Sequence, residues 1–111
     1  MEVGSEIVRF DEICVIRELE DGRTETIRWE DLQEVRIVTT DEGPFCDDVY
    51  WVLTGESSAL LLPSESVGMD RLLARLQELA GFDNQAVIDA MGSVDNAQFV
   101  CWLRKPANSS H

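Results

Sequence analysis

Apolar and polar positions alternate with a period of two through the first two thirds of the chain. Ile27 and Trp29, for example, alternate with Thr26 and Arg28, so one face of a strand is apolar and the other can face water. β-branched and aromatic residues, which fit a pleated surface, recur in the same pattern. This alternation predicts strands over residues 6–10, 13–19, 24–29, 35–40, 49–53 and 59–62.

Turn signals separate these strands. Asp21 and Gly22 form the pair that favours a tight hairpin, because both central residues can take positive φ. Residues 54–58 form a further loop, and Pro63 closes the strand that follows it. Such short connections predict an antiparallel meander or small barrel rather than βαβ units.

After Pro63 the apolar period changes to about 3.6, which predicts an amphipathic helix over about residues 69–80. Ser64 or Ser66 is expected to cap its start, and Gly81 stands where a left-handed C-terminal residue is expected. A second, short helix is predicted between Asp83, a good N-cap, and Gly92. The apolar stripe of the first helix consists of Val67, Leu72, Leu73, Leu76 and Leu79 or Ala80.

The apolar run 98–104 fits either a strand or the last turns of a helix, because its period does not decide between them. Turn-like residues at 94–96 and the nearby Pro106 favour a strand. We therefore expect one domain over residues 1–105, followed by a disordered polar tail over 106–111.

Charge limits the classes of partner. The 111 residues include 22 acidic and 9 basic side chains, a formal net charge of −13. This charge repels nucleic acids and anionic lipid surfaces, so neither is an expected partner. Three cysteines without a C-x-x-C spacing indicate reduced thiols, and no export signal or long apolar run is present. We expect a soluble cytoplasmic protein.

Catalytic and cofactor motifs do not appear. The histidine of the chain, His111, is its last residue, so no histidine-dependent triad or metal cluster is predicted in a core. The spacings G-x-S-x-G, G-x-x-x-x-G-K-[ST] and G-x-G-x-x-G are absent, as is the calcium-loop spacing. The sequence predicts no enzyme, no metal and no cofactor.

Two strings, I-R-W-E-D-L-Q-E-V-R-I (27–37) and L-L-A-R-L-Q-E-L-A-G-F (72–82), follow the strand meander and its Asp-Gly hairpin. In this order they resemble bacterial members of the pleckstrin-homology-like superfamily, over about residues 6–82. The resemblance implies an α+β fold in which a strongly bent antiparallel sheet or split barrel of six or seven strands is closed by a C-terminal amphipathic helix. The second short helix and the run 98–104 lie outside that pattern.

Lipid binding does not carry over from the resemblance. Phosphoinositide recognition needs clustered Lys and Arg near the first hairpin loops. Here residues 18–23 read E-L-E-D-G-R, with one arginine among three acids.

The best local candidate for function is the loop 40–48, where an aromatic residue lies among four carboxylates. An exposed Phe45 can anchor a partner while the acids steer a basic surface towards it. The alternative is a solvated hairpin loop whose Phe45 packs on the core. The candidate binding residues are Asp41, Glu42, Phe45, Asp47 and Asp48.

Two functions follow as hypotheses. The first is a small acidic protein-interaction module that binds a basic protein surface through a loop, a sheet edge or the open end of the barrel. A homodimer through a sheet edge belongs to this hypothesis. The second is an immunity or inhibitor protein whose negative field captures a basic enzyme. A copurifying basic protein would separate the two.

Overall fold

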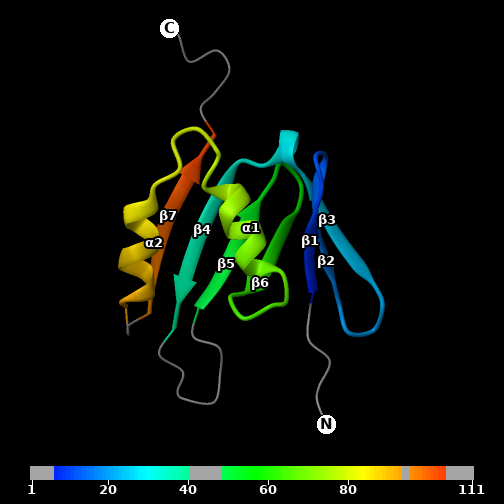
Figure 1. The fold of residues 1–111 in the computed structure, drawn as a ribbon, viewed down its shortest axis with the longest axis horizontal. Helices are drawn as coiled ribbons and strands as arrows, with labels where there is room; N and C mark the ends of the chain where they lie inside the picture. The colour runs from blue at the N-terminus through cyan, green and yellow to red at the C-terminus, as the bar shows by residue number, and fades with distance from the viewer. Residues whose placement is uncertain (1–6, 41–48, 94–95, 105–111) are drawn as a thin grey trace, which may run out of the picture.

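The computed structural model describes residues 7–40, 49–93 and 96–104 (Figure 1). These residues form seven strands, two α-helices and one 3-10 turn. The strands are β1 (Ile7–Phe10), β2 (Cys14–Glu18), β3 (Thr24–Arg28), β4 (Glu34–Thr39), β5 (Val49–Thr54), β6 (Ala59–Pro63) and β7 (Ala97–Leu103); the helices are α1 (Met69–Leu76) and α2 (Asn84–Met91); the 3-10 turn is η1 (Trp29–Asp31).

The strands form two antiparallel sheets, one with the order β1-β2-β3 and one with the order β6-β5-β4-β7. β7 returns after both helices and pairs with β4, so the preference for a strand over 98–104 is confirmed. A register shift between Val35 and Arg36 places two successive residues of β7, Cys101 and Trp102, in the core. Two adjacent buried residues are what a bulge produces in an otherwise alternating strand.

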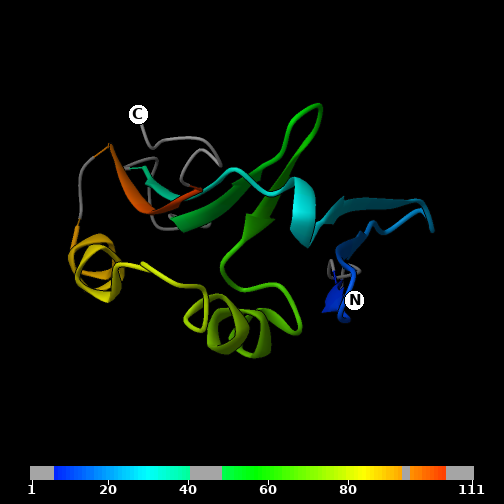
Figure 2. The same ribbon diagram turned by 90° about the horizontal axis from the view of Figure 1, so that it is seen from above.

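Both helices cover the same face of the four-stranded sheet, and the three-stranded sheet lies beside β6 (Figure 2). The segment before α1 joins β1, because the Val8 backbone N–H donates to the Val67 carbonyl at 2.8 Å. Gly68, at φ 93°, follows this contact, and a Cβ built there would lie 2.2 Å from the Val8 carbonyl oxygen. Only glycine fits this close approach and this dihedral.

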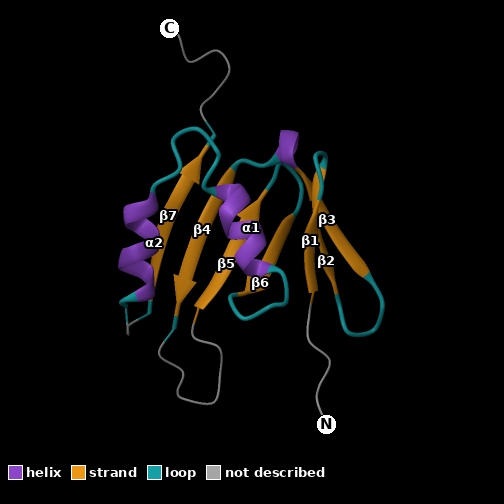
Figure 3. Cartoon of the chain, in the orientation of Figure 1, coloured by secondary structure: helices purple, strands orange, loops and turns teal. Residues whose placement is uncertain are grey.

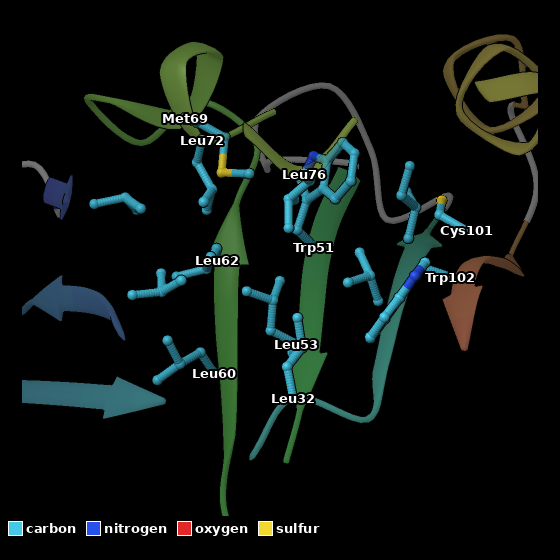
Figure 4. Packing of buried hydrophobic residues seen from close by; sticks show 14 of the residues in the cluster. Leu32, Trp51, Leu53, Leu60, Leu62, Met69, Leu72, Leu76, Cys101 and Trp102 are labelled. Carbon is cyan, nitrogen blue, oxygen red and sulfur yellow. The ribbon is translucent and has the colours of Figure 1, made fainter. Parts of the chain in front are cut away.

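The core lies between the four-stranded sheet and the helices (Figure 4). Leu72 and Leu76 of α1 are fully buried near Trp51 of β5, as the helical stripe predicted. Leu73 is only partly buried, and Val67 is exposed because it precedes the helix and pairs with Ile7. The sheet residues of the core are Val35, Ile37, Trp51, Leu53, Leu60 and Leu62.

Several local predictions need correction. Of the Asp21–Gly22 pair only Gly22 has positive φ, because the connection runs from Leu19 to Arg23 and needs one left-handed residue. The N-cap of α1 is Gly68 rather than a serine, and α1 ends at Leu76 rather than Ala80. The predicted N-cap of the second helix is confirmed, because the Asp83 carboxylate accepts from the Gln85 and Ala86 amides.

The α+β class, with antiparallel strands and two helices, is confirmed (Figure 3). Within residues 7–40, 49–93 and 96–104 the strands form two open sheets and no closed barrel. The predicted tail at 106–111 lies outside the described residues.

Candidate protein-binding site

The predicted acidic binding loop lies outside the described residues, which end at Thr40 and resume at Val49 on either side of it. The site prediction for Asp41, Glu42, Phe45, Asp47 and Asp48 therefore stays a prediction. What the structure describes is the base of the loop, where β4 ends and β5 begins. The buried Thr39 hydroxyl lies 3.3 Å from the Ser93 hydroxyl, which ties this end of β4 to the segment after α2.

The three tryptophans lie in different environments. Trp51 and Trp102 are buried, and the Trp102 indole N–H donates to the Ala80 carbonyl at 2.9 Å. Both side chains therefore belong to the core. Trp29 is only partly buried, and its indole N–H donates to the Asp11 carbonyl at 2.8 Å. Its side chain contacts Phe10 and Arg75 as well.

Next to Trp29 lies the β1–β2 connection, residues 11–14, which we call the Ile13 turn. The Asp11 carboxylate accepts from the amides of Cys14, at 2.9 Å, and Ile13, at 2.8 Å. These two donors hold the pKa of Asp11 below its ordinary value of 3.8. The Asp11 amide in turn donates to the Cys14 carbonyl at 3.0 Å. The turn is therefore closed by its own side chain and backbone.

Trp29 fixes the turn from the other side. Its backbone N–H donates to the Ile13 carbonyl at 2.9 Å, while its indole reaches the Asp11 carbonyl. Although the backbone of Ile13 is fully bonded, its side chain is 62% exposed. An apolar side chain is thus presented to solvent on a rigid support, so binding through it loses little further conformational entropy.

The Trp29 side chain is itself held by neighbours from other elements. The Arg75 guanidinium of α1 lies 4.5 Å from the centre of the indole ring, a cation–π contact. Phe10 of β1 meets the indole edge-on at 6.3 Å. The Arg104 guanidinium, after β7, donates to the Trp29 carbonyl at 2.8 Å. Phe10, Arg75 and Arg104, from three separate parts of the chain, therefore hold Trp29, which in turn bonds the Ile13 turn.

The Ile13 side chain projects between two surface hollows. The first, of about 600 Å³, is lined by Phe10, Asp11, Glu12, Ile13 and Arg75. The second, of about 250 Å³, is lined by Glu12, Ile13, Arg28, Trp29 and Glu30. A projecting side chain with a hollow on each side can fit a partner surface of complementary shape.

The charges around the Ile13 side chain are mostly negative. Arg28 pairs with Glu30 at 2.5 Å, so these two side chains add no net charge. The Asp11 carboxylate carries a negative charge at neutral pH, and the exposed Glu12 forms no ion pair within the described part of the chain. The position therefore combines an apolar centre with the Asp11 and Glu12 carboxylates, and the Arg75 guanidinium that lines the same hollow lies over the Trp29 ring.

Another hollow, of about 630 Å³, lies between β1 and the start of α1. Its lining mixes Arg71 and Asp70, and its Arg9 side chain is already paired with Glu18 across β1 and β2. It is slightly larger than the first hollow at the Ile13 turn, but its exposed Val67 is held through its carbonyl by the Val8 amide alone, whereas both backbone groups of Ile13 are bonded. We therefore place the candidate site at the Ile13 turn.

Side-chain chemistry at this site is suited to contact. Burial, followed by the Asp11 charge, raises the pKa of the Cys14 thiol, so it stays protonated at neutral pH.

Among the residues that the structure describes, no group of three or more His, Cys, Asp or Glu side chains is arranged to hold a metal ion. No helix in the same residues is long and apolar enough to cross a membrane.

Sequence reasoning placed Ile13 in a strand over residues 13–19, and so missed the site. In the structure β2 begins at Cys14, which leaves Ile13 on the turn. The sequence did contain a signal for the turn: Asp11 lies two and three positions before the amides that donate to its carboxylate, a spacing typical of an Asx turn.

Comparison of the chain with protein-family models, curated proteins and solved structures gave no match.

Proposed function

We infer that this chain is a protein-interaction module of pleckstrin-homology-like shape, which binds a basic protein surface at the Ile13 turn. The observation that carries this proposal is the exposure of Ile13 on a turn in which the backbone N–H and C=O groups of Asp11, Ile13 and Cys14 form hydrogen bonds. Tryptophan and arginine, which surround it as Trp29 and Arg75, are typical of the residues that dominate binding energy at interfaces.

Charge supports a basic partner. The chain has 22 acidic side chains against 9 basic ones, and most described arginines are already neutralised within the molecule. The excess carboxylates therefore set the field that a partner meets, and this field speeds association with a basic surface. The neutralised arginines are Arg9, Arg17, Arg23, Arg28, Arg36 and Arg75.

The same charges disfavour phosphoinositides. At the β2–β3 connection Arg23 pairs with Asp21 at 2.8 Å, so its guanidinium is not available as a free phosphate ligand. The neighbouring Glu20 is exposed and repels anions. We propose that the partner offers an apolar pocket for Ile13 and a Lys or Arg side chain opposite Glu12. The acidic residues of the loop 41–48 add to the steering field in this proposal.

The test is the affinity of a purified basic partner, first isolated from the native host at low salt. Ile13→Ala is expected to weaken binding by about tenfold or more in isothermal titration calorimetry, as loss of an anchor does. Ile88→Ala on α2 is the matched control, because Ile88 is 64% exposed and distant in sequence. Circular dichroism checks that both variants are folded.

Equal affinity of the Ile13→Ala variant and the wild type would show that the turn is not the contact. An enzyme partner that loses activity in the complex would favour the immunity or inhibitor function. An enzyme partner that stays active would favour a binding module. Neither outcome depends on which residues form the contact.

A further inference from the structure

The face of the four-stranded sheet that points away from the helices is uncovered by any helix or strand of the described residues (Figure 2). We call it the outer face. Strand register places Leu61, Val52, Arg36 and Val100 in one row across all four strands. Leu61 is 47% and Val100 41% exposed. The apolar residues of the outer face are Val38, Tyr50, Val52, Leu61, Val100 and Leu103.

The charged side chains at the centre of the outer face, Arg36 and Glu34, neutralise one another. The Arg36 guanidinium donates from Nε to the Glu34 carboxylate at 2.7 Å and also bonds the Gln98 side chain. The ion pair leaves no net charge on the face, in contrast to the rest of the molecule. A basic partner would therefore gain little electrostatic attraction here, whereas a second outer face would meet no repulsion at the contact itself.

The size of the outer face sets the strength of such a contact. Four strands about 4.8 Å apart and about five residues at about 3.3 Å each give a footprint of roughly 19 by 17 Å. Two copies would bury well under the roughly 1,600 Å² of a typical stable interface. A dimer through this face is therefore weak, with a dissociation constant on the order of 0.1–1 mM.

We propose that two copies of this chain associate through their outer faces, sheet on sheet, and that salt strengthens the association. A two-fold contact places the same row of each copy against the other, so that Leu61, Val52 and Val100 are buried against apolar side chains while Arg36 keeps its Glu34 partner. Each copy carries a formal charge of −13, so the two repel one another at long range. Dissolved salt screens this repulsion, whereas it weakens the binding of a basic partner.

The experiment is sedimentation equilibrium of the purified chain at about 10 µM to about 1 mM protein, in about 0.05 and 0.5 M NaCl, a range that brackets the expected dissociation constant. A monomer at low concentration and a dimer at high concentration are expected, with an affinity about tenfold higher at the higher salt. A constant monomer mass throughout would overturn the proposal. So would an affinity that falls as salt rises.

Two variants locate the contact. Leu61→Glu on β6 and Val100→Glu on β7 are each expected to abolish the dimer, because each replaces an apolar contact residue of the outer face by a carboxylate and gives the face a net negative charge. Ile88→Glu is the matched control, since it makes the same charge change at an exposed apolar residue of α2 on the other side of the sheet. An equal loss with Ile88→Glu would overturn the assignment to the outer face.

A measurement on the wild-type chain covers the case in which a variant does not fold. Amide chemical shifts should change with protein concentration at the exposed positions of β4, β5, β6 and β7, and not at α2. Shift changes confined to the Ile13 turn or to α2 would overturn the proposal. The outcome leaves the binding of a basic partner at the Ile13 turn open to its own test.

Discussion

The two faces of the four-stranded sheet are built from alternate residues of the same strands, yet one face is buried and the other is partly exposed to solvent. On β4, Val35 and Ile37 are completely buried, while the residues that follow each of them, Arg36 and Val38, are only partly so. On β6, Leu60 and Leu62 are buried, and Leu61 between them is 47% exposed. Residue type does not explain the difference, because three consecutive leucines are divided between the faces. The face is decided by where α1 and α2 pack.

The Ile13 turn shows another way to position an apolar side chain. Inner-face residues are held by burial, which stabilises them by roughly 25 cal/mol per Å² of apolar surface removed from water. Ile13 is held by hydrogen bonds around its backbone, while its side chain stays in water. Inner-face residues therefore serve stability, whereas Ile13 and the outer face are free to serve contacts with other molecules.

The comparison of the faces is tested most strongly by truncating one leucine on each side. Leu72→Ala, in α1 over the inner face, should lower the free energy of unfolding by about 2–5 kcal/mol, because a fully buried leucine leaves a cavity. Leu61→Ala on the outer face should change it by no more than about 0.5 kcal/mol. Urea unfolding, monitored by tryptophan fluorescence at a protein concentration where the chain is monomeric, gives both values.

Comparable losses in the two variants would mean that the outer face is covered in the folded chain. A loss below about 1 kcal/mol for Leu72→Ala would instead mean that the α1 face is misassigned.

A second comparison uses neighbouring positions of β7. Burial, followed by the Asp83 charge, raises the pKa of the Cys101 thiol to about 11, so little thiolate exists at pH 8. In a Cys14→Ser and Cys46→Ser background, Cys101 should react with a disulfide reagent only when the fold opens. A cysteine introduced by Val100→Cys should react on the order of 1,000-fold faster or more, since opening is costly. Absorbance of the released thiol measures both rates.

Similar rates at the two positions would contradict the inward orientation of Cys101 at the bulge. Addition of about 6 M urea should remove the difference, which controls for intrinsic reactivity.

The smallest effect is expected at the Ile13 turn, through Asp11. Backbone donors lower its folded pKa below 3.8, so the ionised carboxylate stabilises the fold above about pH 4. This contribution is lost as pH falls through the folded pKa. Asp11→Asn should therefore lower the urea midpoint at pH 7, and the gap from the wild type should narrow towards pH 3.

A gap of the same size at pH 7 and pH 3 would show that the charge of Asp11 plays no part. Glu12→Gln is the control for the removal of one negative charge from the same turn.

The strands and helices were largely predictable because their signals are local. Six strands, the two helices and the Asp83 cap follow from periodicity and capping chemistry. Errors occurred at the ends of elements, where tertiary contacts compete with local preference. Gly68 is the N-cap of α1 because β1 lies against it. Ile13 lies on the turn rather than in the predicted strand because its amide donates to the Asp11 carboxylate.

The sequence by itself determined the class of the fold, the residues that are apolar on each strand, and the net negative charge. Each depends on residue identity and short spacing, which the chain carries without reference to its partners in space. Only the tertiary structure decided that β7 pairs with β4, that both helices cover one face, and that Trp29 meets Arg75 and the Ile13 turn. These contacts join residues far apart in sequence, and their choice depends on which faces can be buried together, a property that no local pattern contains.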